Sequence, residues 1–251
     1  MITVRQLDYD IGGKVVLRDL NLHVRRGDTV SVMGVSGSGK TTLLKIMAGL
    51  IRPQSGQVFI DSTDITKLSE EELNRVRHRL GVVFQYGALF DSLPVYENVA
   101  FALMRHTHLS RDEIDDIVEE KLALVGMPGT QNLMPAELSG GMQKRVSLAR
   151  AIAMSPEVLF YDEPTSGLDP VMTTVIGNLI MEMRDRLGVT SVVVSHDIEN
   201  IFRISDRIGM LHGGTIVAYG TPEEIRELPD ERVQQFIEGQ AEGPIQPGVL
   251  A

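Results

Sequence analysis

The residues from Gly34 to Thr41 fit the pattern G-x-x-x-x-G-K-[ST], and this segment constrains the fold more than any other part of the chain. Before it, the apolar run 29–33 predicts a short buried strand, and after it residues 42–48 predict a helix. Between a strand and a helix, this pattern forms a loop whose backbone N–H groups and helix N-terminus bind phosphate. The sequence therefore predicts an α/β fold built around one strand–loop–helix unit.

The residues of this loop bind different parts of a nucleoside triphosphate. Its glycines let the backbone turn tightly and approach the phosphates without a Cβ clash. Lys40 is expected to reach the β- and γ-phosphate oxygens, and the Thr41 hydroxyl to bind Mg²⁺. We expect nucleotide contacts from Gly34, Val35, Ser36, Gly37, Ser38, Gly39, Lys40, Thr41 and Thr42.

Composition limits the other functions open to the chain. Its 251 residues, 43% of them hydrophobic, are enough for one α/β core with a subdomain. The net charge of −10 argues against nucleic acid as a partner, and the absence of cysteine excludes disulfides and thiolate zinc sites. The N-terminus lacks a signal-peptide pattern, and no apolar run approaches the ~20 residues that span a bilayer. A membrane role is therefore expected to depend on a partner.

Strands and helices alternate along most of the chain. Residues 2–9 and 20–24 predict an antiparallel edge sheet, and a capping box from Ser69 to Glu72 opens a helix through Leu80, before a strand at 82–84. Residues 95–154 are helical in pattern, which indicates an inserted helical subdomain. Strands at 158–161 and 190–194 flank a helix at 170–187. This alternation predicts a mostly parallel sheet.

Polar residues follow the predicted parallel strands, whose carboxyl ends face a common crevice in such sheets. Gln85 follows strand 82–84, Asp162 and Glu163 follow strand 158–161, and His196 follows strand 190–194. Asp162 is expected to hold Mg²⁺ directly or through water, and Glu163 to accept a proton from the attacking water. His196 is expected to contact the γ-phosphate through Nε2.

A second glycine-rich segment predicts a second anion site. Ser139, Gly140 and Gly141 precede the predicted helix 143–154, so a hydroxyl, backbone N–H groups and a helix dipole converge there. A single bound nucleotide offers no phosphate to this second site. The two motifs together predict that two chains share each nucleotide.

The ordered set of phosphate loop, Gln85, Ser139-Gly-Gly, Asp162-Glu163, Ser166-Gly-Leu-Asp169 and His196 resembles the ATP-binding cassette (ABC) ATPases over nearly the whole chain. The resemblance implies a P-loop NTPase (RecA-like) fold, with ATP and Mg²⁺ as cofactors. It implies a single ATPase domain at 1–237, with a RecA-like core at about 1–87 and 155–220, a helical subdomain at about 88–154, and a C-terminal extension at 222–251.

The resemblance also implies roles between chains. Two copies pack head to tail, each ATP lying between one phosphate loop and the partner's Ser139, Gly140 and Gly141. Asp169 resembles the residue that links the two sites, and Gln85 the one that senses Mg²⁺ or water. The helical subdomain resembles the part that docks onto a transmembrane permease.

Two positions depart from the family pattern. Met142 stands where glutamine is common, which puts in doubt that residue's contact with the nucleotide of the other chain. Ile11 stands where an aromatic ring often stacks on adenine, and the nearby Tyr9 is an open alternative for that contact.

Segments 85–99, 135–142, 230–239 and 242–244 are similar to the ATPase subunits of Mla-type, MCE-associated lipid transporters. This similarity implies phospholipid transport between bacterial inner and outer membranes, with a permease dimer, MCE-domain subunits and a small STAS-domain protein as partners. The chain would then lie at the cytoplasmic face of the inner membrane. Leu89, Phe90 and Val95 fit a docking groove or a subdomain core equally well.

Two further alternatives stay open. A cassette that drives a membrane signalling or cell-division complex would share every one of these residues. The Gly- and Pro-rich tail at 240–251 is either a disordered end or a segment that reaches the partner chain.

Overall fold

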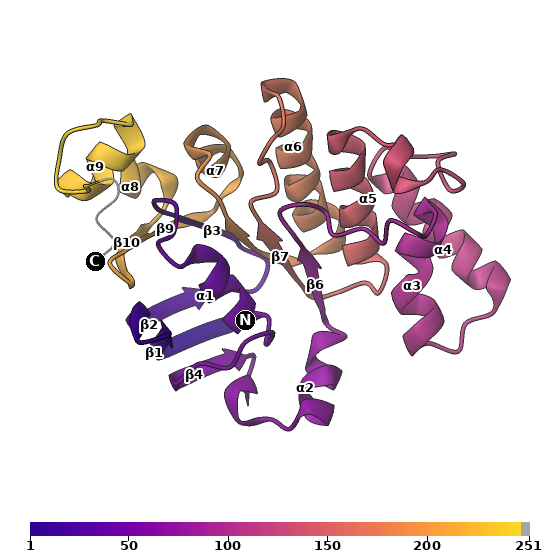
Figure 1. Ribbon diagram of the computed structural model, residues 1–251, viewed down its shortest axis with the longest axis horizontal. Helices are drawn as coiled ribbons and strands as arrows, with labels where there is room; N and C mark the ends of the chain where they lie inside the picture. Colours follow the sequence, from indigo (N-terminus) through magenta and orange to yellow (C-terminus); the bar gives the residue numbers. More distant parts are fainter. Residues whose placement is uncertain (247–251) are drawn as a thin grey trace.

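The structure is a computed structural model that describes residues 1–246, and these residues form two sheets (Figure 1). The larger sheet has the order β10-β9-β3-β8-β7-β6, and its neighbours from β9 to β6 are parallel while β10 pairs antiparallel with β9. Its strands are β3 (Thr29–Met33), β6 (Leu80–Val83), β7 (Val158–Asp162), β8 (Thr190–Val194), β9 (Arg207–His212) and β10 (Thr215–Gly220).

The smaller sheet is antiparallel and has the order β2-β1-β4-β5. Its strands are β1 (Ile2–Ile11), β2 (Lys14–Val24), β4 (Ser55–Ile60) and β5 (Thr63–Asp64). A mostly parallel sheet beside an antiparallel sheet, with helices added, confirms the predicted fold class.

The two faces of the larger sheet bury different elements, because successive side chains of a strand point to opposite faces. In β7, Val158 and Phe160 belong to a core shared with α1 (Lys40–Met47) and the smaller sheet. Leu159 and Tyr161 belong instead to a core shared with the helices at residues 95–187. The phosphate loop therefore lies beside one core and the helical part of the chain beside the other.

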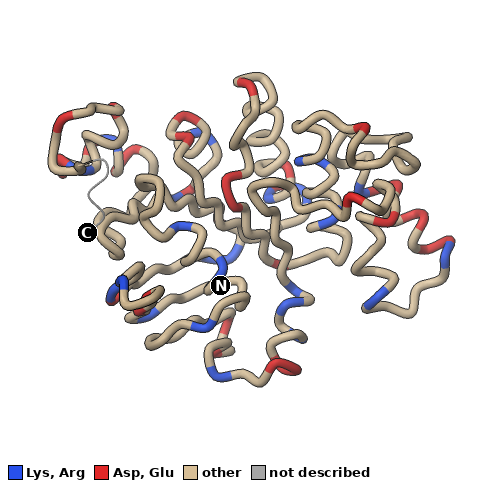
Figure 2. Tube along the Cα trace, in the orientation of Figure 1, with Lys and Arg blue, Asp and Glu red and all other residues tan. Residues whose placement is uncertain are grey.

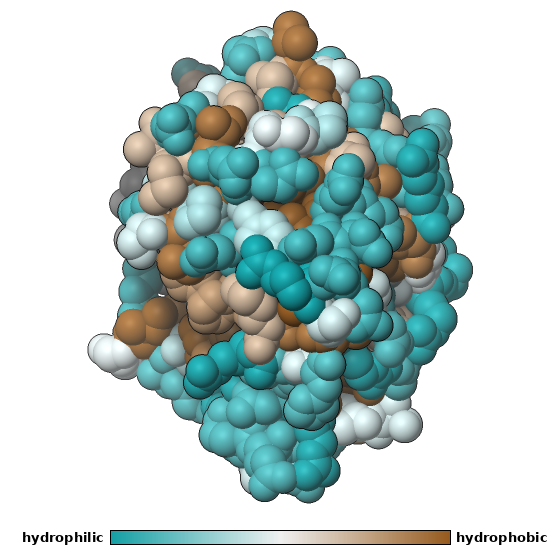
Figure 3. Space-filling view, turned by 90° about the vertical axis from the view of Figure 1, so that its right-hand side faces the viewer, coloured by the Kyte–Doolittle hydropathy of each residue, from teal (hydrophilic) through white to brown (hydrophobic). Residues whose placement is uncertain are grey.

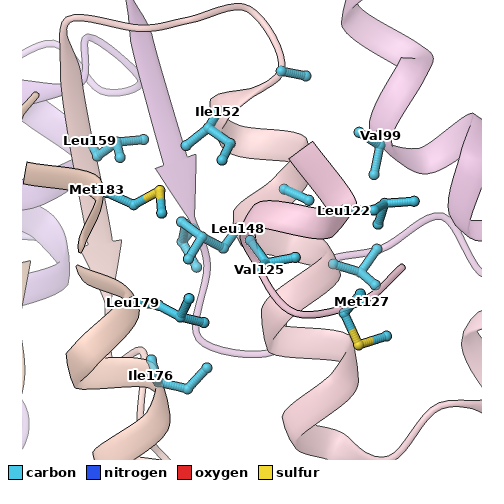
Figure 4. Packing of buried hydrophobic residues seen from close by; sticks show 14 of the residues in the cluster. Val99, Leu122, Val125, Met127, Leu148, Ile152, Leu159, Ile176, Leu179 and Met183 are labelled. Carbon is cyan, nitrogen blue, oxygen red and sulfur yellow. The ribbon is translucent and has the colours of Figure 1, made fainter. Parts of the chain in front are cut away.

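The helical part is centred on α5 (Gly140–Ile152), which packs against α3 (Val95–His106), α4 (Arg111–Leu124) and α6 (Pro170–Leu187). Figure 4 shows Leu148 and Ile152 of α5 on the side of Leu159 and Met183, with Val125 and Leu122 beyond them. The remaining helices in the described part of the chain are η1 (Ile65–Lys67), α2 (Glu70–Arg77), η2 (Pro135–Glu137), α7 (Ile198–Ile204), α8 (Pro222–Glu227) and α9 (Glu231–Glu238).

The predicted boundary between α2 and β6 is wrong. Helix α2 opens at the Ser69 capping box as expected, but it ends at Arg77, and β6 already begins at Leu80. Leu80 pairs in register with Val158, while the preceding Arg79 forms ion pairs with Asp61 and Glu157. These long-range contacts favour the extended backbone over another helical turn.

The C-terminal segment packs on its own chain as far as the structure describes it. Ile245 is 5% exposed, and the Gln235 side chain of α9 binds both its N–H (2.7 Å) and its carbonyl oxygen (3.0 Å). The part of the predicted tail at 247–251 lies outside the described residues. Residues 240–246 therefore contact α9 of the same chain.

The surface is polar and of mixed charge. Figure 2 shows basic and acidic residues interspersed along the chain, with acidic residues prominent on α4. Figure 3 views the end formed by α3 to α5 and shows apolar surface in places between hydrophilic residues. Among residues 1–246, no helix combines the length and the apolar character needed to cross a bilayer.

Candidate nucleotide-binding site

The phosphate loop connects β3 to α1 and depends on glycine geometry. Gly37 and Gly39 have positive φ angles of 79° and 101°, and Gly39 directly precedes the first residue of α1. A Cβ on Gly34 would lie 2.3 Å from the Leu211 carbonyl oxygen of β9. The backbone therefore needs glycine at these positions to pass close to its neighbour and turn into the helix.

The polar atoms of the loop fit a triphosphate and its metal ion. The Ser38 hydroxyl oxygen is buried and has no hydrogen-bond partner within residues 1–246. Lys40 Nζ donates to the carbonyl oxygens of Gly34 (2.8 Å) and Val35 (3.0 Å), and burial lowers the pKa of this lysine despite nearby Glu163 and Asp162. An orphaned hydroxyl and a desolvated ammonium are both stabilised when an anion binds between them.

Thr41 and Asp162, predicted to hold Mg²⁺, lie in contact. Thr41 Oγ1 donates a hydrogen bond of 2.7 Å to Asp162 Oδ1, which joins the start of α1 to the end of β7. Hydroxyl and carboxylate oxygens are the ligands that Mg²⁺ prefers. The donor set therefore fits a magnesium ion at the phosphate loop.

A cavity of about 470 Å³ lies beside the phosphate loop and is lined by three of the other predicted site residues. Gln85, Glu163 and His196 come from the ends of different strands, as the sequence predicts, and all three line it. Its lining residues are Ile11, Val16, Ser36, Gly37, Gly39, Lys40, Thr41, Thr42, Gln85, Glu163 and His196.

Glu163 is buried at the centre of this arrangement. Its backbone has a φ of 46°, in the left-handed region that is uncommon for glutamate and is found at functional sites. Oε2 lies 2.8 Å from His196 Nδ1, and Oε1 lies 4.0 Å from Lys40 Nζ. The carboxylate is thus held between an imidazole and the ammonium of the phosphate loop.

Gln85 and Lys144 connect the site to the helical part. The Gln85 side chain donates to Ser166 Oγ at 3.3 Å, and its main-chain carbonyl accepts a hydrogen bond from Lys144 Nζ of α5. The sequence assigns no role to Lys144, Ser166 or Val16. For Lys144 no local signal exists, because a lysine in an amphipathic helix normally faces solvent.

The second glycine-rich segment lies outside this cavity. Ser139 caps α5 by accepting a hydrogen bond from Met142 N–H, and Asp169 caps α6 by accepting from Val171 and Met172 N–H. Within residues 1–246, neither Ser139–Gly141 nor Asp169 is among the residues that line the cavity. One chain therefore brings together the phosphate loop and Glu163, the predicted general base, but not the second predicted anion site.

The departure at Ile11 also has a structural counterpart. Ile11 and Val16 line the cavity, and Ile11 is 58% exposed. Tyr9 is partly buried against the core of the smaller sheet and is not among the lining residues. The apolar surface next to the phosphate loop is therefore aliphatic.

These features define an ATP-binding cassette, and comparison with known proteins agrees. The sequence profile of the family described as ABC transporter matches residues 17–166, more than half of the 251 residues. The chain belongs to this family and is a nucleotide-binding ATPase.

Individual members of the family show how similar this chain is to known cassettes. The chain is 44% identical to the intermembrane phospholipid transport system ATP-binding protein MlaF of Haemophilus influenzae, over 98% of this chain and 93% of that protein. It is 41% identical to the probable ribonucleotide transport ATP-binding protein mkl of Mycobacterium tuberculosis, over 97% and 68%. The dimeric post-hydrolysis structure of the cassette MJ0796 bound to ADP and Pi matches with a TM-score of 0.81 and 33% identity, over 88% of this chain and 99% of that one.

Proposed function

We propose that two copies of this chain pack head to tail around two ATP molecules and drive a membrane permease that moves phospholipid between the inner and outer membranes. The observation that carries the dimer is the separation of the two anion sites within one chain. Ser139 to Gly141 are not among the residues that line the cavity beside the phosphate loop. A related cassette has been solved as a dimer with ADP and Pi, which supports the same arrangement here.

In the proposed dimer, each site takes residues from both chains. One chain supplies the phosphate loop, and the partner supplies the hydroxyl and N–H groups at the start of its α5. Asp169, which caps α6, is proposed to lie at the same interface because it resembles the residue that links the two sites in the family. Met142 takes the place of the glutamine common in the family, and its thioether is a weak acceptor that provides no amide donor.

Hydrolysis is assigned to the residues around Glu163. Glu163 accepts the proton of the attacking water, and His196, whose Nδ1 faces Glu163, has Nε2 left to contact the γ-phosphate. Thr41, Asp162 and Gln85 would hold Mg²⁺, which would neutralise charge on the phosphate oxygens. Lys40 supplies a second positive charge from the phosphate loop.

A groove between the core and the helical part is the proposed docking site of the permease. Its volume is about 700 Å³. Phe90 and Phe101, each 41% exposed, pack with ring centroids 4.7 Å apart and line it together with Arg77 and Arg150. The sequence left a docking groove and a subdomain core as alternative roles for Phe90 and Val95. Val95 is fully buried in the core, whereas Phe90 lines the groove. Exposed aromatic side chains beside basic residues fit an amphipathic segment of the permease.

Phospholipid is proposed as the transported substrate because the match to MlaF is stronger and extends over nearly the whole of both proteins. The relatives differ in the substrate that their names give, since mkl is named a probable ribonucleotide transport protein. That match, however, leaves about a third of mkl uncovered. MCE-domain subunits and a small STAS-domain protein are the further proposed partners, with the assembly at the cytoplasmic face of the inner membrane.

The decisive test is purification of the intact membrane assembly through a tag on this chain. Mass spectrometry of its subunits and of its extracted lipids should identify a permease with MCE-domain subunits and bound phospholipid. An assembly that contains a permease but binds ribonucleotide instead would contradict the proposed substrate. An assembly whose membrane partner carries no cargo would favour the signalling alternative.

A further inference from the structure

Three side chains of α5 bind carbonyl oxygens of the segment that follows β6. Lys144 Nζ donates to Gln85 O, Ser147 Oγ donates to Gly87 O at 2.9 Å, and the Arg150 guanidinium donates to Gly87 O at 2.8 Å and Ala88 O at 2.7 Å. The donors are spaced three residues apart and so follow one side of the helix. The main chain of this segment is therefore bound to α5 at Gln85, Gly87 and Ala88.

The backbone of this segment depends on these contacts. Gly87 and Ala88 have positive φ angles of 73° and 48°, and the second is unfavourable for a residue with a Cβ. Residues 85–88 form no strand hydrogen bonds with β7, because the pairing of β6 with β7 ends at Val83. The hydrogen bonds from α5 thus stabilise a turn that begins at Gln85.

Lys144 differs from the other two donors because it also reaches the catalytic carboxylate residue. Its Nζ lies 3.4 Å from the main-chain carbonyl oxygen of Glu163. The residue is 7% exposed, and burial lowers the pKa of its ammonium, while Asp162 and Glu163 oppose that shift. A buried ammonium with three donors can bind two carbonyl groups at once, which a neutral apolar side chain of the same length cannot do.

We propose that Lys144 is a positioning residue for hydrolysis, whose ammonium fixes the main chain at Gln85 and Glu163 relative to α5. The Glu163 backbone is already in a strained conformation, so the direction of its carboxylate depends on what holds its carbonyl group. Lys144 acts through these two residues and is assigned no contact with the nucleotide.

If the chains form the proposed dimer, the position of α5 affects the contacts with both bound nucleotides. The helix begins with Ser139 to Gly141, which face the partner's nucleotide, and one turn later Lys144 contacts the catalytic residues of its own site. A movement of α5 when the partner's nucleotide binds would move Glu163 of the same chain.

The test compares Lys144→Met and Lys144→Arg in the full-length chain. Methionine keeps the length of the side chain but donates no hydrogen bond, whereas arginine retains donors. We expect Lys144→Met to lower kcat for ATP by about tenfold or more, with KM changed by less than about threefold, since catalytic geometry is affected rather than binding. Lys144→Arg should restore most of the lost kcat.

Lys121→Met is the matched control. Lys121 is also 7% exposed, but it lies on α4 and its ammonium pairs with Glu120 at 2.7 Å. Amide hydrogen exchange gives a readout that does not need turnover. Peptides covering 85–88 and 162–166 should exchange faster in Lys144→Met and not in Lys121→Met.

Two results would overturn the proposal. One is a folded Lys144→Met chain with wild-type kcat and unchanged exchange at 85–88. The other is an equal loss of kcat in Lys121→Met, which would indicate a general effect of removing a buried lysine. The exchange measurement is made within one chain, so failure of the dimer model would leave its result valid. Failure of the Lys144 test would leave the shared-site proposal intact.

Discussion

At the scale of single residues, the surroundings of Glu163 fit its proposed role as the general base for hydrolysis. Its carboxylate is buried, contacts His196 at 2.8 Å and lies 4.0 Å from the Lys40 ammonium. Its backbone φ of 46° is unfavourable, and the Glu163 N–H bond to the Val194 carbonyl oxygen at 2.9 Å helps to maintain it. Backbone strain at Glu163 and contacts from two other elements together define one direction for its carboxylate.

We predict that Glu163→Gln lowers the rate of phosphate release at least about 100-fold, because an amide keeps the size of the side chain but cannot accept the proton of water. ATP binding, measured with a fluorescent analogue, should be retained. Chromatography with ATP present should show a larger trapped species. The exposed Glu119→Gln on α4 serves as the control. A Glu163→Gln chain that hydrolyses ATP at the wild-type rate would refute the general-base role.

The aliphatic lining beside the phosphate loop leads to a second prediction. Ile11 is 58% exposed at the cavity, where an aromatic ring would stack on a base. Ile11→Tyr should tighten ATP binding about two- to tenfold, as expected for one added aromatic stack. Equilibrium titration measures this directly. Tyr9→Phe, outside the cavity lining, should bind as the wild type does, and an unchanged Kd for Ile11→Tyr would place the base elsewhere.

How far the sequence predicts a residue depends on where its contacts come from. The phosphate-loop residues are predictable because one contiguous segment contains the strand end, the turns and the helix start. Gln85, Glu163 and His196 are predictable as a group because parallel strands end at a common edge. Lys144 is not predictable, because its proposed role depends on the packing of α5 on the segment 85–88, which no local pattern encodes.

At the scale of elements, an ion-pair network joins the two sheets. Arg79, just before β6, contacts Asp61 and Glu157, which follow β4 and precede β7 respectively, each at 2.7 Å. Arg26 contacts the same two acids. The network explains why the chain leaves α2 before residue 79, where periodicity alone predicts that the helix continues.

Arg79→Gln should lower the free energy of unfolding at neutral pH by about 1 kcal/mol, since these side chains are partly exposed and solvent screens the pairs. For a chain of this size, the expected shift in Tm is about 2–4 °C. Arg186→Gln on α6 is the control, because its partner Glu182 lies on the same helix. Equal effects of the two substitutions would show that the network adds nothing to an ordinary helix pair.

The same network predicts a dependence on pH. Hydrogen bonds from Arg79 hold the pKa of Glu157 at about 2, below its ordinary value of 4.5. A carboxyl whose folded pKa is lowered contributes stability above its ordinary pKa and loses it as pH falls toward the folded pKa. The difference in unfolding free energy between wild type and Arg79→Gln should therefore be largest at neutral pH. It should decrease as the pH falls from about 4.5 to about 3, the practical limit of the titration. Urea titrations across this range measure it, and a constant difference would contradict the assignment.

At the scale of the whole molecule, the proposed dimer requires each chain to carry complementary halves of two nucleotide sites. The cavity holds the phosphate loop and Glu163, while Ser139, at the start of α5, stands apart from it. A two-fold arrangement is self-complementary, so one contact between a phosphate loop and a partner's α5 implies its equivalent in the other site. Substitution of Lys40 should therefore inactivate the site at the chain's own phosphate loop, whereas substitution of Ser139 should inactivate the site at the partner's phosphate loop.

This complementarity is tested by mixing Lys40→Ala and Ser139→Arg chains, each inactive on its own. In a mixed dimer, one site combines both defects, and the other pairs an intact phosphate loop with an intact Ser139. If equal amounts of the two chains exchange partners freely, about half of the dimers are mixed, and each mixed dimer has one intact site. The mixture then has up to about a quarter as many intact sites as the same amount of wild-type protein. ATPase activity of the mixture above the sum of the separate chains, appearing as the chains exchange, is the expected result. A chain carrying both substitutions, mixed with Lys40→Ala, provides the control because no intact site can form. If each nucleotide site lay within a single chain, the mixture of Lys40→Ala and Ser139→Arg chains would show no ATPase activity above that of the separate chains. The proposed permease would then have to be driven by a movement other than the closure of two chains around ATP.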